Sequence, residues 1–150
     1  MINEQIQQII KASEADLIAM RRELHENPEL PWEEFETTKR IARELDKMGI
    51  EYRLTEPTGI IAEIKGGKAG KTVALRADID ALPVQELSDI PYKSKVEGKM
   101  HACGHDTHTA MLLTAAKALN AVKAELQGNV RLIFQPAEEL AEGAIAMVKQ

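Results

Sequence analysis

The stretch THTAMLLTAAKALNAVKAELQGNVRLIF, residues 107–134, decides the fold class of this chain. Its first part, from Thr107 to about Val122, is rich in alanine and predicts a helix, with Asp106 placed to cap its start. Its last part, GNVRLIF, is a short apolar run typical of a buried strand. A helix that leads into a buried strand indicates an α/β domain, in which helices cover a sheet.

The residues before this stretch predict helices first and strands afterwards. Residues 4–26 carry apolar side chains at near-helical spacing and predict one amphipathic helix, which Pro28 ends. Residues 35–48 repeat the period, and Gly49 is a natural C-cap. The predicted strands are IEYRL, GIIAEI and KTVALRA, with KGGKAGK as a turn between the last two. With a further helix over residues 139–148, the pattern predicts one domain of helices flanking a mixed sheet.

Composition limits the function classes. Hydrophobic residues make up 44% and aromatic residues 3%, so the core must be aliphatic. The net charge of −5 shows no excess of lysine and arginine, which argues against a nucleic-acid partner. No apolar run approaches the roughly 18 residues that span a bilayer, and the N-terminus MINEQIQQII lacks the charge pattern of a signal peptide. We expect a cytoplasmic protein without a membrane partner.

Potential metal ligands are concentrated in MHACGHDTHT, residues 100–109. In an extended segment Cys103 and His105 point to the same side, so that a thiolate and an imidazole can reach one metal ion. Taken alone, such a pair is more often a buried cysteine beside a surface histidine. Asp106 has two interpretations, as the helix N-cap or as a carboxylate that fixes the tautomer of a ligand histidine.

Acidic pairs follow two of the predicted strands where these end. Glu138 and Glu139 come after VRLIF, and Asp78 and Asp80 come after TVALRA. For the two glutamates the alternative explanation is a helix N-terminus, where acidic residues are favoured. For the two aspartates it is a polar loop tip. Adjacent glutamates point in different directions, so one can bind metal while the other moves protons. Cysteine, histidine and carboxylates that converge on one edge of a sheet indicate a metal hydrolase.

Four motifs in order, RRELHENPEL, LRADIDALPV, HACGHDTHTAMLL and IFQPAEEL, resemble the dinuclear metal-dependent amidohydrolases of the aminoacylase and carboxypeptidase-G-like superfamily. The resemblance is strongest to the branch of hippurate hydrolases, N-acyl-amino-acid amidohydrolases and auxin-conjugate hydrolases, and it runs over essentially the whole chain. It implies that residues 1–150 are the N-terminal part of a phosphorylase/hydrolase-like, metal-binding catalytic domain. The remainder of that domain and a lid or dimerisation domain would be absent.

The resemblance also implies roles for individual residues. Cys103, His105 and Glu139 are expected to be metal ligands, and Glu138 the catalytic acid/base, with Asp80 as a supporting catalytic aspartate. Support around the ligands is assigned to Asp78, Asp106 and His108. The complete site would hold two divalent ions of manganese, zinc or cobalt, with two further histidine ligands from the absent region. The expected reaction is hydrolysis of the amide bond of N-acyl amino acids such as hippurate, in a homodimer or homotetramer.

Two other interpretations stay open. The chain stops at Gln150, before the further histidines would appear, so it is also consistent with a non-catalytic fragment that carries a partial metal site. A thiol-based redox protein using Cys103 is the weaker alternative, because no second cysteine exists to resolve an oxidised thiol. His25 and Trp32 are expected to be structural, and His101 is expected at the rim of the site.

Overall fold

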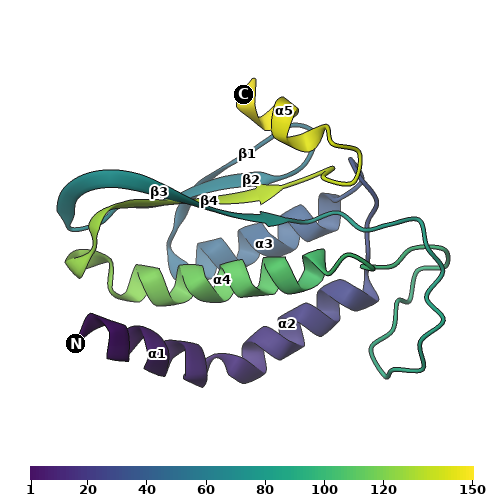
Figure 1. Cartoon of the computed structure of the whole chain (residues 1–150), viewed down its shortest axis with the longest axis horizontal. Coiled ribbons are helices and arrows are strands. Elements are labelled where there is room, and N and C mark those ends of the chain that lie inside the picture. The colour runs from purple at the N-terminus through teal and green to yellow at the C-terminus, as the bar shows by residue number, and fades with distance from the viewer.

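The computed structural model describes residues 1–150, and it places a mixed sheet between helices on both faces (Figure 1). The elements in chain order are α1 (Ile2–Ala12), α2 (Glu14–Glu26), α3 (Phe35–Met48), β1 (Glu51–Leu54), β2 (Ile60–Ile64), β3 (Lys68–Asp78), α4 (His105–Ala121), the 3₁₀ turn η1 (Lys123–Glu125), β4 (Gln127–Gln135) and α5 (Gly143–Val148). The predicted α/β class with a mixed sheet is therefore confirmed.

The four strands lie in the order β1-β2-β4-β3. β2 pairs antiparallel with both β1 and β4, whereas β3 pairs parallel with β4. The unit β3–α4–β4 is thus a crossover between parallel strands, and the register places Asp78 opposite Gln135. Both acidic segments that follow these strands consequently leave the sheet at the same edge.

The predicted turn KGGKAGK joins β2 to β3 but is shorter than predicted, and these two strands are not neighbours in the sheet. β4 lies between β2 and β3, and β3 already begins at Lys68. The glycines also serve close approach of the backbone: a Cβ on Gly67 would lie 2.1 Å from the carbonyl oxygen of Ala124, and a Cβ on Gly70 would lie 2.7 Å from the amide nitrogen of Gly128.

The core lies between the sheet and the helices α3 and α4, with α1 and α2 as an outer layer on α4 (Figure 1). Phe134, near the end of β4, is its only aromatic member, as the composition predicts. The other members of this cluster are Ile41, Leu45, Ile50, Ile60, Ala62, Ile64, Ala77, Ile79, Leu112, Leu113, Ala116 and Leu132. α5 lies on the opposite face (Figure 1). None of the helices combines the length and the apolar character that a bilayer crossing requires.

Two predicted helices have different bounds in the structure. The predicted helix over residues 4–26 is interrupted at Ser13, a residue type that competes with helical hydrogen bonding through its side chain. The break lets α1 and α2 each pack on α4. The predicted helix over 139–148 begins only at Gly143, because Ala141 has a positive φ of 56° and closes a turn onto the carbonyl of Glu138.

Candidate metal centre

At the carboxyl ends of the parallel strands β3 and β4, His105 lies between two acidic segments. The Nδ1 atom of His105 lies 2.9 Å from the carbonyl oxygen of Asp80 and 3.3 Å from its Oδ1 atom. The opposite ring nitrogen, Nε2, lies 3.7 Å from Oε2 of Glu138 and 3.9 Å from Oε1 of Glu139. With Nδ1 as the donor to Asp80, Nε2 presents its lone pair to the glutamates, which is the tautomer that a metal-binding imidazole needs.

Asp80 connects the two halves of this arrangement. Its Oδ2 atom accepts a hydrogen bond of 3.0 Å from the backbone amide of Glu139, and the residue is 1% exposed. Burial by itself raises the pKa of Asp80, but hydrogen bonds from His105 and from the amides of Glu139 and Glu138 outweigh burial, so that the pKa is lowered. Asp80 is therefore a carboxylate that orients both His105 and the glutamate segment.

The charge of Asp80 acts on His105 in turn. Burial lowers the pKa of His105, but the hydrogen bonds and the charge of Asp80 more than compensate and raise the pKa to about 9. In the metal-free protein at neutral pH the ring is therefore an imidazolium between carboxylates. A metal ion at Nε2 has to displace that proton.

The glutamate pair divides into an exposed and a buried member. The side chain of Glu138 is 39% exposed, whereas that of Glu139 is 18% exposed. The Oε1 atom of Glu139 is buried without a hydrogen-bond partner. One ligand atom each from His105, Glu138 and Glu139 lies within 4.8 Å of the other two. A nitrogen and two carboxylates around an unsatisfied buried oxygen fit a divalent ion such as zinc or manganese.

Cys103 lies beside this group rather than within it. The cysteine is exposed, and a hydrogen bond to the Glu139 carboxylate raises the pKa of its thiol. That Cys103 shares a metal site with His105 and Glu139 stays a prediction. Its sulfur is not among the atoms that form the compact ligand groups.

A second group lies on the other side of His105. Asp78, His105 and His108 also offer ligand atoms within 4.8 Å of one another. Asp78 is held by Arg76, with 3.0 Å between Nε and Oδ1 and 3.1 Å between Nη2 and Oδ2. His108 is exposed, and its ring lies 5.7 Å from that of His105. Arg76 thus partly balances the charge of Asp78 in this group.

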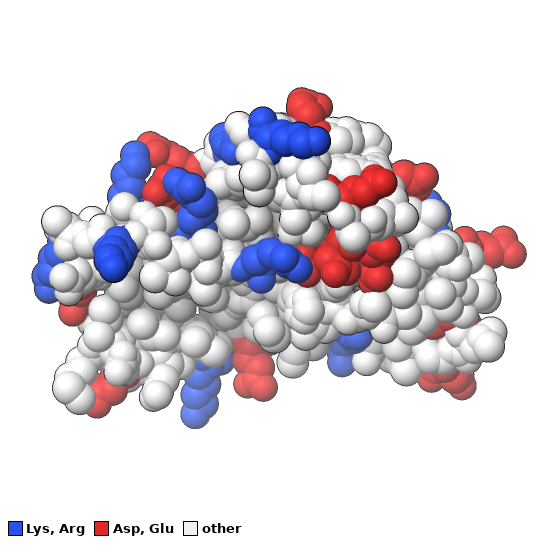
Figure 2. Space-filling view, turned by 45° about the horizontal axis from the view of Figure 1, so that its top comes forward, with Lys and Arg blue, Asp and Glu red and all other residues white.

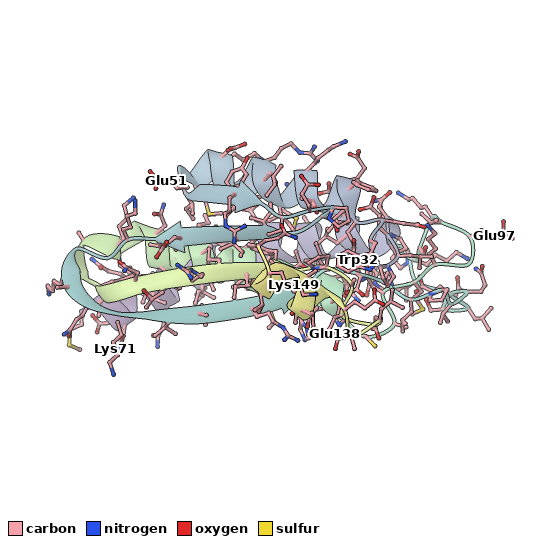
Figure 3. All side chains as sticks on the ribbon, turned by 90° about the horizontal axis from the view of Figure 1, so that it is seen from above. Trp32, Glu51, Lys71, Glu97, Glu138 and Lys149 are labelled. Atoms are coloured by element: carbon pink, nitrogen blue, oxygen red, sulfur yellow. The ribbon has the colours of Figure 1, made fainter.

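The surroundings of the centre are acidic. Figure 2 shows acidic side chains gathered in a patch on the visible face, while lysine and arginine are more scattered. Viewed from above, Glu138 lies toward the end of the sheet opposite Lys71, and Trp32 and Lys149 lie on the same side (Figure 3). The carboxyl edge of the sheet is therefore the natural place for a cation.

Comparison with known proteins agrees with this chemistry. Residues 74–150 match the model of the peptidase family M20/M25/M40. The chain belongs to this peptidase family. The M20 chain is 58% identical over 137 residues to the N-acetylcysteine deacetylase of Bacillus subtilis, covering 89% of the chain and 36% of that protein. It is 54% identical over 134 residues to the IAA-amino acid hydrolase ILR1-like 5 of Arabidopsis thaliana, covering 89% of the chain and 31% of that protein.

A solved structure extends the comparison to three dimensions. The YXEP protein of Bacillus subtilis, described as a dinuclear metal binding peptidase from the M20 family, superposes with a TM-score of 0.89 at 55% identity. The match covers 93% of the M20 chain and 39% of the YXEP chain. The chain thus spans between about a third and two fifths of the length of these relatives.

Two predictions about single residues of the M20 chain are wrong. Asp106 is not the N-cap, because α4 begins at His105 and its N-cap is Gly104 with a φ of 86°. Asp106 instead lies 2.7 Å from Nδ1 of His25 and 2.9 Å from Nε of Arg21. The tautomer of His105 is set by Asp80. His101 is not at the rim: it is 4% exposed, and burial lowers its pKa to about 4.

His25 and Trp32 have structural contacts, as predicted. His25 is buried between Asp106 and Glu86, with 3.2 Å between its Nε2 and Oε1 of Glu86. Burial raises the pKa of Glu86, but hydrogen bonds from Ser88, Ser94 and His25 outweigh it and bring the pKa to about 2. Trp32 donates from Nε1 to the carboxylate of Glu142 over 3.0 Å.

The sequence analysis did not single out Glu86 or the buried Glu34. Neither belongs to a recognisable spacing pattern, and the contacts of Glu86 with His25 and of Glu34 with Ala137 join residues that are far apart in the chain. The only local signal was an acidic residue in a loop, which is common on protein surfaces.

Proposed function

We propose that the protein carrying this chain is a metal-dependent amidohydrolase that cleaves the amide bond of N-acyl amino acids. The observation that carries the proposal is the orientation of His105, with Nδ1 held by Asp80 and Nε2 facing Glu138 and the unpartnered Oε1 of Glu139. The printed names of two relatives, an N-acetylcysteine deacetylase and an IAA-amino acid hydrolase, support amino-acid conjugates as the substrate class.

The residues fit a divalent ion, and we propose that the complete site holds two, for which manganese, zinc and cobalt are the candidates. His105 and Glu139 would hold metal through Nε2 and Oε1, and Cys103 would join them from the exposed side. When bound, such ions lower the pKa of water toward neutrality and polarise the substrate carbonyl. Residues 1–150 would then be the N-terminal part of the catalytic domain, with the remaining ligands supplied from outside them.

Glu138 is the proposed proton carrier. Its carboxylate is the more exposed member of the pair, so it can reach both a water molecule and the substrate. It takes a proton from the attacking water and returns it to the amine that leaves when the amide bond breaks. Glu139 is more buried, which suits a ligand that must stay in place. Asp80 holds His105 and the amide of Glu139 throughout.

The remaining features of the proposal follow from the family. We propose a cytoplasmic homodimer or homotetramer that acts on a small-molecule substrate, without nucleic acid or membrane as partner. The alternative of a non-catalytic fragment is favoured by one observation, the single compact group of three ligand atoms around Glu139. Two ions sharing three ligands would each have fewer than the three that a catalytic metal normally needs.

The test uses the complete protein, that is, these residues together with whatever follows them in the reading frame. Bound metal is counted by elemental analysis, and hydrolysis of hippurate and of N-acetyl amino acids is followed in parallel. Glu138→Gln keeps the shape of the side chain and removes the proton acceptor. It should retain metal and lose about 10²- to 10⁴-fold in kcat.

The matched control is Glu97→Gln, at an exposed position that Figure 3 places far from Glu138. This variant should behave like the unmodified protein. Turnover of Glu138→Gln at the rate of the control would reject Glu138 as the proton carrier. A complete protein that binds metal but cleaves none of these amides would reject the substrate class.

A further inference from the structure

Glu34 is a buried carboxylate that the proposed reaction does not use. It lies between α2 and α3 and is 0% exposed. Its Oε1 atom accepts a hydrogen bond of 2.8 Å from the backbone amide of Ala137, and its Oε2 atom accepts one of 2.7 Å from the hydroxyl of Thr58. Ala137 directly precedes Glu138 and Glu139, so Glu34 contacts the segment that carries the glutamate pair.

The backbone at Ala137 needs such a contact. Its φ is +48°, a conformation that side chains other than glycine rarely adopt. The residue is fully buried, so water cannot satisfy its amide, and the carboxylate of Glu34 is the acceptor that does. On the other side, the carbonyl of Ala137 accepts a hydrogen bond of 3.2 Å from the amide of Gly143. Both polar groups of this one residue are therefore fixed.

The loop that carries Thr58, the second partner of Glu34, is itself held by hydrogen bonds. The hydroxyl of Thr55 donates to the carbonyl of Thr58 over 2.7 Å, and the amide of Gly59 donates to the hydroxyl of Thr38 over 3.1 Å. A Cβ on Gly59 would lie 2.7 Å from Cδ of Pro136, so the loop before β2 packs closely on the segment after β4. A displacement of Glu34 would be transmitted to Ala137 rather than absorbed elsewhere.

We propose that Glu34 is a positioning residue, which holds the turn at Ala137 so that Glu138 faces the reacting water and Glu139 faces Nε2 of His105. This inference rests on the proposed function. Glu34 acts through the backbone and touches neither substrate nor metal. Burial raises the pKa of Glu34, and the hydrogen bonds from Ala137 and Thr58 only partly offset that effect. The side chain is needed for its two acceptor contacts rather than for proton transfer.

This assignment separates two substitutions at the same position. In Glu34→Gln, the amide oxygen still accepts from Ala137, and the hydroxyl of Thr58 can turn to accept from the amide nitrogen. In Glu34→Ala, both contacts are lost and the amide of Ala137 is buried without an acceptor. A catalytic acid or a metal ligand would be lost in both substitutions, whereas a positioning residue is rescued by glutamine.

The experiment measures kcat and KM for an N-acyl amino acid in the complete protein. A displacement of about 1 Å at a catalytic group costs on the order of 100-fold, so Glu34→Ala should lower kcat about 100-fold with KM little changed. Glu34→Gln should stay close to the unmodified protein. An equal loss in both variants would overturn the positioning role, and so would full turnover by folded Glu34→Ala.

A second pair of variants covers the case in which Glu34→Ala fails to fold. Thr58→Val removes the contact to Oε2 with little change in volume, and Thr58→Ser keeps it. kcat should fall in the valine variant and be restored by serine. Equal kcat values for the two would overturn the proposal.

A third measurement tests the role of Glu34 without depending on the proposed function. The hydrogen exchange of the Ala137 amide is measured by NMR in the unmodified protein and in its Glu34→Gln and Thr58→Val variants. Faster exchange in Thr58→Val than in the other two supports the assignment, and identical exchange overturns it. Absence of hydrolysis in the unmodified protein would reject the proposed function and leave this comparison valid.

Discussion

Replacement of Asp80 by asparagine tests the electrostatic arrangement of the centre most directly. Asp80 is 1% exposed, and its carboxylate lies 3.3 Å from Nδ1 of His105. Asparagine retains an acceptor for the amide of Glu139 and removes the negative charge. The carbonyl oxygen of residue 80, which lies 2.9 Å from Nδ1, is unaffected by the substitution.

The magnitude follows from the pKa of His105, which rises from an ordinary 6.5 to about 9. At about 1.4 kcal/mol per pH unit, this difference corresponds to roughly 3 kcal/mol of folding free energy. Because the folded-state pKa is the higher one, the contribution is fully present below pH 6.5 and is lost as the pH rises through about 9. Asp80→Asn should remove most of this dependence.

The assay is urea denaturation of the metal-free protein, in the presence of a chelator, between about pH 6 and pH 9.5. The unmodified protein should lose roughly 3 kcal/mol of unfolding free energy across that range, and Asp80→Asn should show a much flatter profile. Asp89→Asn, an exposed aspartate in the following loop, is the matched control. A flat profile for the unmodified protein, or an equally steep one for Asp80→Asn, would refute the reasoning.

Three further results are expected. Metal affinity should rise at least about tenfold per pH unit below about pH 9, because metal displaces the proton of His105 and, if Cys103 binds, that of its thiol as well. Calorimetry in buffers of different protonation enthalpy counts the protons released, and affinity independent of pH would contradict this. His25→Ala should cost about 1 to 3 kcal/mol in chemical denaturation, because it removes one hydrogen-bond partner from each of two buried carboxylates. A loss below about 1 kcal/mol would mean that neither carboxylate depends on His25. Residues 1–150 expressed alone should neither bind two ions tightly nor hydrolyse hippurate. Two ions that share three ligands would each have fewer than the three protein ligands that a catalytic metal normally needs. Calorimetry measures the binding, and a hydrolysis assay measures the turnover.

The fold class and the location of the centre could be predicted because both depend on local pattern. The apolar runs of β3 and β4 and the alanine-rich helix between them define a parallel crossover, and its geometry places Asp80 and Glu139 at one edge. The order of the strands could not be predicted in the same way. The glycines at 66, 67 and 70 were interpreted as a turn, whereas they also allow close approach of the backbone, at 66 and 70 to Gly128 and at 67 to Ala124.

The supporting contacts of the centre were beyond the reach of sequence patterns. Asp106 precedes a helical run, which made it a natural N-cap candidate, but its partner His25 comes from α2, 81 residues earlier. Glu34 and Ala137 are separated by 103 residues. Such contacts depend on how elements pack in three dimensions. Spacing within one segment carries no information about them.

The position of β3 in the sheet has a consequence for how the centre can be completed. β3 pairs with β4 on one side only, and its side chain Val73 is 60% exposed. An edge strand presents free amide and carbonyl groups on which another strand can pair. Because β3 ends in the segment that carries Asp78 and Asp80, a strand added there would finish beside His105. The edge of the sheet along β3 thus offers a place where another polypeptide segment can pair and bring side chains to the metal centre.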